Sequence, residues 1–278
     1  MPRHHVNQHS HRPNRAARTG LDRSRRVLGQ NFLRDERTIR QIVRAAAVGP
    51  ADLVLEVGAG RGALTRPLAR VCGRLVAYEI DADLAGQLAR EFATTERVRV
   101  VPGDFVAARP PAEPFVVVGN IPYASTTRIV EWCLAAPTLR TATLVTQLEY
   151  ARKRCGDYHR WTLRTVQTWP RFHWRLAGRI PRERFRPRPR VDSGILQLAR
   201  RPVDLLPADL LPDYARFVEL GFRGLGGSLR TSLHRGYPAR RVDAALRAHR
   251  ISPAALPGEI WPEQWIALFL AVRHDARR

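Results

Sequence analysis

The chain has 278 residues, with 47 lysines and arginines against 25 aspartates and glutamates, and its formal net charge is +22. Its hydrophobic share of 44% is ordinary for a folded protein, which excludes wholesale disorder. No apolar run approaches the roughly 20 residues that a membrane-spanning helix needs, so we expect no membrane partner.

Positive charge is concentrated in two stretches. Residues 1–26 hold 7 arginines and 1 acid, and residues 151–201 hold 14 arginines, 1 lysine and 3 acids, whereas the other segments are nearly balanced. A GC-rich coding sequence would explain why Lys153 is the only lysine, but not the excess over acids or its clustering. The pattern favours a polyanion, above all nucleic acid, as the partner.

The N-terminal stretch and the cysteines bear on localisation. Residues 1–24 are rich in histidine and arginine and lack the apolar core of a secretory signal, so we expect a disordered basic arm; an organelle transit peptide has a similar composition. Cys72, Cys133 and Cys155 are odd in number and form no CxxC pair. They favour reduced thiols in a cytoplasmic protein, with no metal site.

From residue 35 to residue 147, predicted helices and strands alternate. Asp35 is a candidate N-cap for the first helix, whose apolar residues recur at helical spacing from Ile39 to Ala46. Strands are predicted at residues 52–57, 74–80, 98–101, 115–118 and 141–147, and helices at 63–72, 83–92 and 126–135. This alternation indicates βαβ units and a parallel sheet that is buried on both faces.

After residue 150 the pattern changes twice. Two further strands, at residues 171–176 and 193–200, flank a loop rich in proline and arginine. Helices are then predicted at residues 214–222, 228–234, 242–249 and 263–272. We place a domain boundary near Arg201, which gives an α/β domain over residues 25–201 and a small all-helical domain over residues 202–278. In the latter, Trp261 and Trp265 are expected in the core.

Glycines and acids follow three successive predicted strands. Gly58, Gly60 and Gly62 lie where a strand turns into a helix, which lets a ligand approach the backbone, although a tight turn alone would explain them. Glu79 and Asp104 follow the next two strands, where a carboxylate accepts hydrogen bonds from ribose hydroxyls or an adenine amine. Because parallel strands bring their carboxyl ends to one edge of a sheet, a nucleotide site is predicted there. These residues do not separate a nicotinamide cofactor from S-adenosylmethionine.

The segment Asn120-Ile121-Pro122-Tyr123 adds a more specific chemistry. An adenine amine is a poor nucleophile because its lone pair is conjugated with the ring. The Asn120 amide oxygen and the Ile121 carbonyl can accept its two hydrogens, and Pro122 fixes the turn. The Tyr123 ring offers a surface for a base taken out of its stack. A simple Asn/Pro turn explains this segment only in isolation from the other motifs.

These motifs occur in the order seen in ribosomal RNA adenine N6-methyltransferases, and the chain resembles the Erm family in particular. The resemblance covers about residues 25–202 and rests on the segments Gln30-Asn31-Phe32-Leu33, 56–65, Ala77-Tyr78-Glu79, Gly103-Asp104, 120–123 and 185–193. It implies a Rossmann-like class I methyltransferase fold with a mostly parallel seven-stranded sheet. It also implies that a monomer transfers methyl from S-adenosyl-L-methionine to the N6 amine of one adenine of 23S ribosomal RNA, before full ribosome assembly. In that family the modification confers resistance to macrolides, lincosamides and streptogramin B.

The resemblance also assigns roles to individual residues. The cofactor contacts that it implies are Asn31, Leu33, Gly58, Gly60, Glu79, Asp104 and Asn120. The catalytic set is Asn120, Ile121, Pro122, Tyr123 and Phe185. Phe185 would be a second aromatic wall for the base or, alternatively, a core phenylalanine.

The basic stretch then supplies the predicted RNA contacts, because arginine both neutralises phosphate and stacks on unpaired bases. These contacts are Arg152, Lys153, Arg154, Arg160, Arg164, Arg182, Arg184 and Arg186. A solvated charged face is the simpler explanation for any single one of them.

Three alternatives differ in target or in class. A small-subunit (16S) dimethyladenosine transferase shares the motifs but more often has leucine where Ile121 stands, and the compact C-terminal region also favours Erm. A non-catalytic nucleic-acid-binding relative is disfavoured by the intact segment from Asn120 to Tyr123. A nicotinamide dehydrogenase is disfavoured because the chain offers no hydride-transfer signature.

Overall fold

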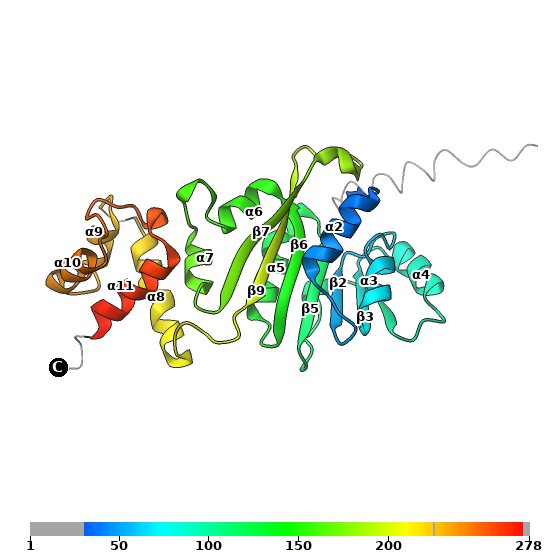
Figure 1. Cartoon of the computed structure of the whole chain (residues 1–278), viewed down its shortest axis with the longest axis horizontal. Coiled ribbons are helices and arrows are strands. Elements are labelled where there is room, and N and C mark those ends of the chain that lie inside the picture. The colour runs from blue at the N-terminus through cyan, green and yellow to red at the C-terminus, as the bar shows by residue number, and fades with distance from the viewer. Residues whose placement is uncertain (1–30, 225, 275–278) are drawn as a thin grey trace, which may run out of the picture. The chain divides into compact units, whose positions relative to one another are not determined.

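The computed structural model describes residues 31–224 and 226–274 (Figure 1). The basic arm predicted at residues 1–24 therefore lies outside the described residues. Within them, a seven-stranded sheet runs in the order β4, β3, β2, β5, β6, β9, β7. Its strands are β2 (Leu53–Val57), β3 (Arg74–Glu79), β4 (Val98–Pro102), β5 (Phe115–Asn120), β6 (Leu139–Gln147), β7 (Phe172–Ile180) and β9 (Ser193–Arg200).

The sheet is parallel from β4 to β6, and β9 pairs antiparallel with both β6 and β7. The predicted mostly parallel α/β sheet is thus confirmed, and the strands lie close to their predicted positions. Strand β7 runs four residues further than predicted. Its register shifts between Leu176 and Gly178, so this glycine lies inside the strand at an irregularity.

Helices cover both faces of the sheet. In β2, Val54 belongs to a core cluster with Ile42 of α2 (Glu36–Ala46) and Leu68 of α3 (Thr65–Val71). Its neighbour Leu55 belongs to the opposite cluster, which includes Ile129 of α5 (Thr126–Ala135). All five side chains of β2 are buried, as an unbroken apolar run in a parallel sheet predicts.

Two helices begin at aspartates that satisfy their first N–H groups. The Asp35 carboxylate accepts hydrogen bonds from the backbone N–H and the hydroxyl of Thr38, at 2.8 and 2.6 Å, which confirms the predicted start of α2. Asp81 accepts from the backbone N–H groups of Asp83 and Leu84 at the start of α4 (Ala82–Glu91). Such a cap stabilises a helix by about 1 kcal/mol.

The predicted C-terminal helices are present and share one continuous core with the sheet. They are α8 (Leu211–Phe222), α9 (Leu229–Leu233), α10 (Ala239–Ala248) and α11 (Pro262–His274). The Tyr214 hydroxyl of α8 donates to the Val166 carbonyl of α7 (Leu163–Thr168) at 3.1 Å. The Trp169 ring N–H donates to Glu263 of α11, also at 3.1 Å. The domain boundary near Arg201 stays a prediction.

The two tryptophans of this region differ. Trp265 is fully buried and stacks on Phe222, so its prediction is confirmed. Trp261 is 53% exposed, and the prediction that it lies in the core is wrong. It lies just before α11 and packs beside Trp161, at 5.5 Å between ring centroids, without being enclosed.

Several short elements were not predicted. β1 (Phe32–Leu33) and β8 (Phe185–Arg186) form a two-stranded antiparallel sheet, and α6 (Leu148–Arg154) and α7 follow β6. The remaining elements are 3-10 turns: η1 (Phe105–Ala107), η2 (Tyr123–Ser125), η3 (Asp157–His159), η4 (Arg182–Arg184), η5 (Ala208–Leu210) and η6 (Pro257–Glu259). Among the described residues, no helix combines the length and the apolar character needed to cross a membrane.

Candidate active site

The ends of four neighbouring strands bring the predicted site residues to one edge of the sheet. The glycine loop at 58–62 follows β2, Glu79 ends β3, Asp104 follows β4, and Asn120 ends β5. These strands are adjacent in the order β4, β3, β2, β5, and all are parallel, so the four features lie side by side. This is the edge at which open α/β sheets bind ligands.

The glycine loop needs glycine at three positions. Gly58, Gly60 and Gly62 have φ angles of +70°, +57° and +78°, a region that other residues rarely adopt. The Gly58 N–H donates to the Tyr78 carbonyl at 2.9 Å, which ties the loop to β3. A Cβ atom at Gly60 would lie 3.2 Å from the Phe32 ring. The loop is therefore bare backbone, closely covered by the segment before α2.

Glu79 is oriented by the same loop. It is only 2% exposed, and its carboxylate accepts from the backbone N–H groups of Gly60, at 2.6 Å, and Asp81, at 2.9 Å. Burial raises the pKa of Glu79, and backbone donors from Asp81, Gly60 and Ile80 oppose that shift. The carboxylate is therefore held in place by the backbone at the end of β3.

Glu56 is a second buried acid beside Glu79, and sequence reasoning gave it no role of its own. It is 1% exposed, and within the described residues its Oε2 has no hydrogen-bond partner. Burial, reinforced by the nearby Glu79 charge, raises the pKa of Glu56 to about 8. The side chain is therefore mostly neutral at pH 7, which spares the site two adjacent buried charges.

Asp104 has one oxygen tied to its own turn and one facing a cation. Its Oδ1 accepts from the Val106 N–H at 3.2 Å. Its Oδ2 accepts from Arg128 of α5 at 3.3 Å, and both side chains are substantially exposed. The carboxylate thus reaches the surface of the edge, where a purine amine could share it with Arg128.

Asn120 is held by the chain segment that precedes α2. Its Nδ2 donates to the Asn31 carbonyl at 2.7 Å. Since a side-chain amide has one donor and one acceptor end, this bond turns Oδ1 away from Asn31. Within the described parts of the chain, no hydrogen bond engages Oδ1. The structure therefore holds an acceptor ready at the end of β5.

Tyr123 is fixed by a partner from a distant strand. Its hydroxyl lies 2.7 Å from the Ser193 hydroxyl, at the first residue of β9. The ring is partly buried, and burial raises the pKa of the phenol. Pro122 precedes it at φ −60°, and Ile121 is buried beneath the turn. Sequence reasoning included Ser193 in a motif without a role; nothing local indicated that it would reach Tyr123.

The β1–β8 sheet closes this edge from the N-terminal side. Leu33 pairs with Phe185, and the Arg61 guanidinium lies 5.1 Å from the centre of the Phe32 ring. Leu33 and Phe185 are 5% and 1% exposed and share a core cluster with Ile42. Phe185 thus packs as the alternative of a core phenylalanine expects, and the Leu33 side chain is buried in the same cluster.

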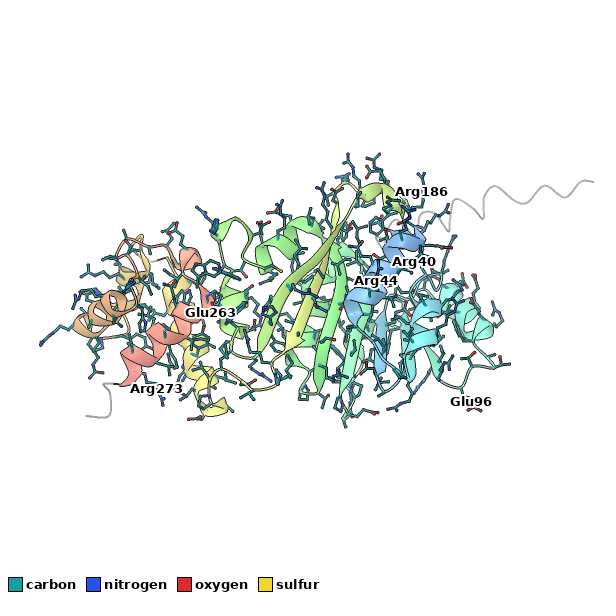
Figure 2. All side chains as sticks on the ribbon, in the orientation of Figure 1. Arg40, Arg44, Glu96, Arg186, Glu263 and Arg273 are labelled. Atoms are coloured by element: carbon teal, nitrogen blue, oxygen red, sulfur yellow. The ribbon has the colours of Figure 1, made fainter. Side chains whose placement is uncertain are left out.

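The basic residues predicted to contact RNA fall into two groups. Six have partners within the chain: Arg184 with Asp35 at 3.0 Å, Lys153 with Glu149 at 3.4 Å, Arg182 with Glu183 at 3.5 Å, Arg152 with Asp157, Arg164 with Glu131, and Arg154 over the Tyr150 ring at 5.0 Å. The other two, Arg160 and Arg186, are exposed, and Arg182 is exposed as well despite its ion pair. Figure 2 labels Arg186 on the connection between β7 and β9, near Arg40 of α2 in that view.

The family follows from comparison with known proteins. A family described as ribosomal RNA adenine dimethylase matches residues 21–273, a span that holds all the residues discussed above. The chain belongs to the ribosomal RNA adenine dimethylase family. A dimethylase-family relative, the rRNA adenine N-6-methyltransferase of Streptomyces fradiae, is 54% identical over 253 residues, covering 90% of this chain and 79% of that protein.

Within the dimethylase family the chain is of the Erm type. The crystal structure of the 23S rRNA methyltransferase ErmE is 48% identical to it, with a TM-score of 0.84, and the match covers 87% of this chain and 99% of that one. A ribosomal RNA small subunit methyltransferase A from Synechococcus elongatus is 32% identical, covering 88% of this chain and 94% of that protein. The resemblance stated from the motifs is thus confirmed.

Proposed function

We propose that this adenine N6-methyltransferase modifies one adenine of 23S ribosomal RNA and thereby confers resistance to macrolides, lincosamides and streptogramin B. The observation that carries the proposal is the free acceptor of Asn120 at the sheet edge, in a chain 48% identical to ErmE, which is described as a 23S rRNA methyltransferase. All predicted site residues come from one chain, so a monomer suffices. Its place of action is the cytoplasm, where bacterial ribosomal RNA is made.

The edge residues fit S-adenosyl-L-methionine as the cofactor. A Cβ atom at Gly60 would contact Phe32, which favours glycine at this position. The loop therefore has no side chain there, and a ligand can approach its backbone. The Glu79 carboxylate stands at the end of β3, where ribose hydroxyls would donate to it, and the partly exposed Asp104 carboxylate is suited to an adenine amine. When bound there, S-adenosyl-L-methionine supplies an electrophilic methyl group on a sulfonium. Asn31, Leu33, Gly58, Gly60, Glu79, Asp104 and Asn120 are the residues that we propose hold it.

Asn120 acts on the target amine in this proposal. Its Oδ1 and the Ile121 carbonyl accept the two amine hydrogens, which favours a pyramidal nitrogen with its lone pair released from the ring. The Asn31 carbonyl keeps the Asn120 amide in the required orientation. Positioning of this kind supplies much of the rate enhancement, and a strong base is not needed, because the methylated nitrogen is acidic and gives its extra proton to water.

Tyr123 supports the flipped base. It follows Asn120 by three residues, and its hydroxyl is anchored to Ser193 of β9. A fixed ring lowers the entropy cost of stacking an unpaired base. Exposed arginines of the basic stretch, including Arg160, Arg182 and Arg186, contact the phosphates around it.

The proposal is tested by supplying the purified chain with methyl-labelled S-adenosyl-L-methionine and, separately, protein-free 23S and 16S ribosomal RNA. We expect label on 23S RNA, recovered after digestion as N6-methylated adenosine. Labelling of 16S RNA alone would favour the small-subunit activity, and RNA binding without label on either would indicate a non-catalytic relative.

A further inference from the structure

A cleft of about 530 Å³ opens between the start of α6 and the two ends of the connection from β7 to β9. Its walls include Leu148, Arg152, Pro181, Arg190, Val191 and Asp192. The Leu148 N–H donates to the Asp192 carbonyl at 2.9 Å, so the two walls are joined by the backbone at the base of β9. Two of the predicted RNA contacts, Arg152 and Arg182, also line it, but the roles proposed above assign it no particular part of the RNA.

One wall of the cleft continues into the residue that anchors Tyr123. Asp192 lines it, and the next residue, Ser193, makes the hydrogen bond to the Tyr123 hydroxyl at 2.7 Å. Arg190 is three residues from Ser193, so their Cα atoms are at most about 11 Å apart. A group in the cleft is therefore within reach of a nucleotide whose base lies on Tyr123.

The cleft retains a cation for an incoming anion. Its three carboxylates are engaged: Asp192 accepts from Arg179 and from the Arg182 N–H, Glu183 pairs with Arg188, and Glu149 pairs with Lys153. In contrast, the Arg190 guanidinium is exposed and forms no ion pair with the residues that the structure describes. An arginine in this state is suited to a phosphate group.

The cleft also has apolar residues next to Arg190. The apolar side chain of Val191 is 45% exposed, although the strand β9 that begins two residues later is largely buried. Together with Pro181 and Leu148 it gives the cleft an apolar patch. A ribose or a base face covers such a patch, whereas an inorganic anion would not.

We propose that this cleft binds the nucleotide adjacent to the target adenosine in the RNA strand, with its phosphate on Arg190 and its sugar or base against Val191. The inference rests on the proposed function, because only a polynucleotide substrate carries a second nucleotide bonded to the one on Tyr123. Binding that neighbouring nucleotide fixes the RNA strand beside the flipped base. This local contact adds to the general electrostatic attraction of the basic stretch.

The test is a double-substitution cycle on binding affinity. Short RNA hairpins containing the target adenosine carry one uncharged methylphosphonate, either 5′ or 3′ of that adenosine or at a remote position. The protein is the wild type, Arg190→Gln, or Arg175→Gln, whose arginine is exposed in the same basic stretch but outside the cleft.

We expect Arg190→Gln and one of the two adjacent methylphosphonates each to weaken binding about tenfold, as the loss of a charged hydrogen bond does. When Arg190→Gln meets that same methylphosphonate, binding should be no weaker than with either change alone. For Arg175→Gln, the loss of affinity should instead multiply with the loss caused by each methylphosphonate. Multiplicative effects for Arg190→Gln at both adjacent phosphates, or no effect of that variant, would overturn the inference. Failure of the wild type to methylate the unmodified hairpin would count against the proposed function instead, since the cycle reads binding.

Discussion

Asn120 carries the proposed chemistry, and its hydrogen bond to Asn31 makes the consequence of replacing it definite. Asn120→Ala removes the acceptor for the target amine and leaves the basic surface intact. We expect kcat to fall by at least about 100-fold, as for loss of an aimed transition-state hydrogen bond, while the Kd for RNA changes little. Single-turnover methyl transfer and filter binding measure the two quantities. Retention of near wild-type kcat would show that another group positions the amine.

Glu56 gives a prediction about stability and pH. Its pKa is about 8 in the folded protein against an ordinary 4.5, so the folded state binds more protons between these values. The free energy of unfolding should therefore fall as pH rises from about 4.5 to 8, by up to about 1.4 kcal/mol per pH unit from this group. In Glu56→Gln, which keeps the shape without the ionisation, that contribution disappears.

Urea unfolding of the wild type and Glu56→Gln at pH 5, 6, 7 and 8 measures the difference. The variant should gain stability relative to the wild type as pH rises. Glu96→Gln is the matched control, because Glu96 is exposed, as Figure 2 shows, and its replacement should leave the pH dependence unchanged. A difference that is constant with pH would mean that Glu56 is ionised in the folded state.

At the scale of elements, the β1–β8 sheet holds the Asn31 carbonyl against Asn120. Asp35 helps to hold this sheet in place, because one of its oxygens pairs with Arg184, directly before β8. Its other oxygen caps α2. Asp35→Asn preserves the cap, since asparagine is an equally good N-cap, but removes the ion pair. We expect kcat to fall a few-fold, with the Kd for RNA and the thermal midpoint nearly unchanged.

Variants of Arg184 distinguish this structural role from a direct contact with RNA. Arg184→Lys, which keeps a cation opposite Asp35, should restore most of the activity that Arg184→Gln loses. If Arg184→Gln instead weakens RNA binding and leaves kcat intact, Arg184 is an RNA contact, as the sequence alone predicts. Steady-state kinetics at saturating RNA, with binding measured in parallel, distinguishes the two.

Local patterns predicted the elements that are long and amphipathic or fully buried. β2 is an unbroken apolar run, and Asp35 is a cap that the sequence displays directly. The β1–β8 sheet was not predictable in this way, because two residues show no periodicity and their partners lie about 150 positions away. Trp261 was misplaced for a related reason, since a residue just before a helix has no periodicity that assigns it a face.

The site was predictable as far as strand order determines it. Glu79, Asp104 and Asn120 had to meet once the sheet was parallel. The contacts that hold them did not follow from the sequence: the Tyr123–Ser193 pair, the Asp104–Arg128 pair and the burial of Phe185 all depend on packing between distant segments.

At the scale of the whole molecule, charge places the RNA. Segments 27–150 and 202–278 are nearly balanced, whereas 151–201 holds 15 basic residues against 3 acids. Replacing Arg160, Arg182 and Arg186 together by glutamine should lower the slope of log affinity against log salt by about 0.7 to 0.9 for each phosphate that is no longer neutralised. Kd values over a range of salt concentrations measure this slope.

A charge-matched control lies in the C-terminal helices. Replacing Arg235, Arg240 and Arg247 removes the same number of exposed positive charges from a nearly balanced segment. This variant should bind RNA with an almost unchanged slope. Equal losses in the two triple variants would mean that RNA covers the C-terminal helices as much as the basic stretch.

The central claim, methylation of one large-subunit adenine through Asn120, is tested most directly by mass spectrometry of ribosomal RNA fragments from cells that express the wild type or Asn120→Ala. We predict one or two added methyl groups on a single adenine of 23S RNA with the wild type, and none with the variant. Methyl groups on two adjacent 16S adenines, or an identical 23S modification with Asn120→Ala, would contradict the account.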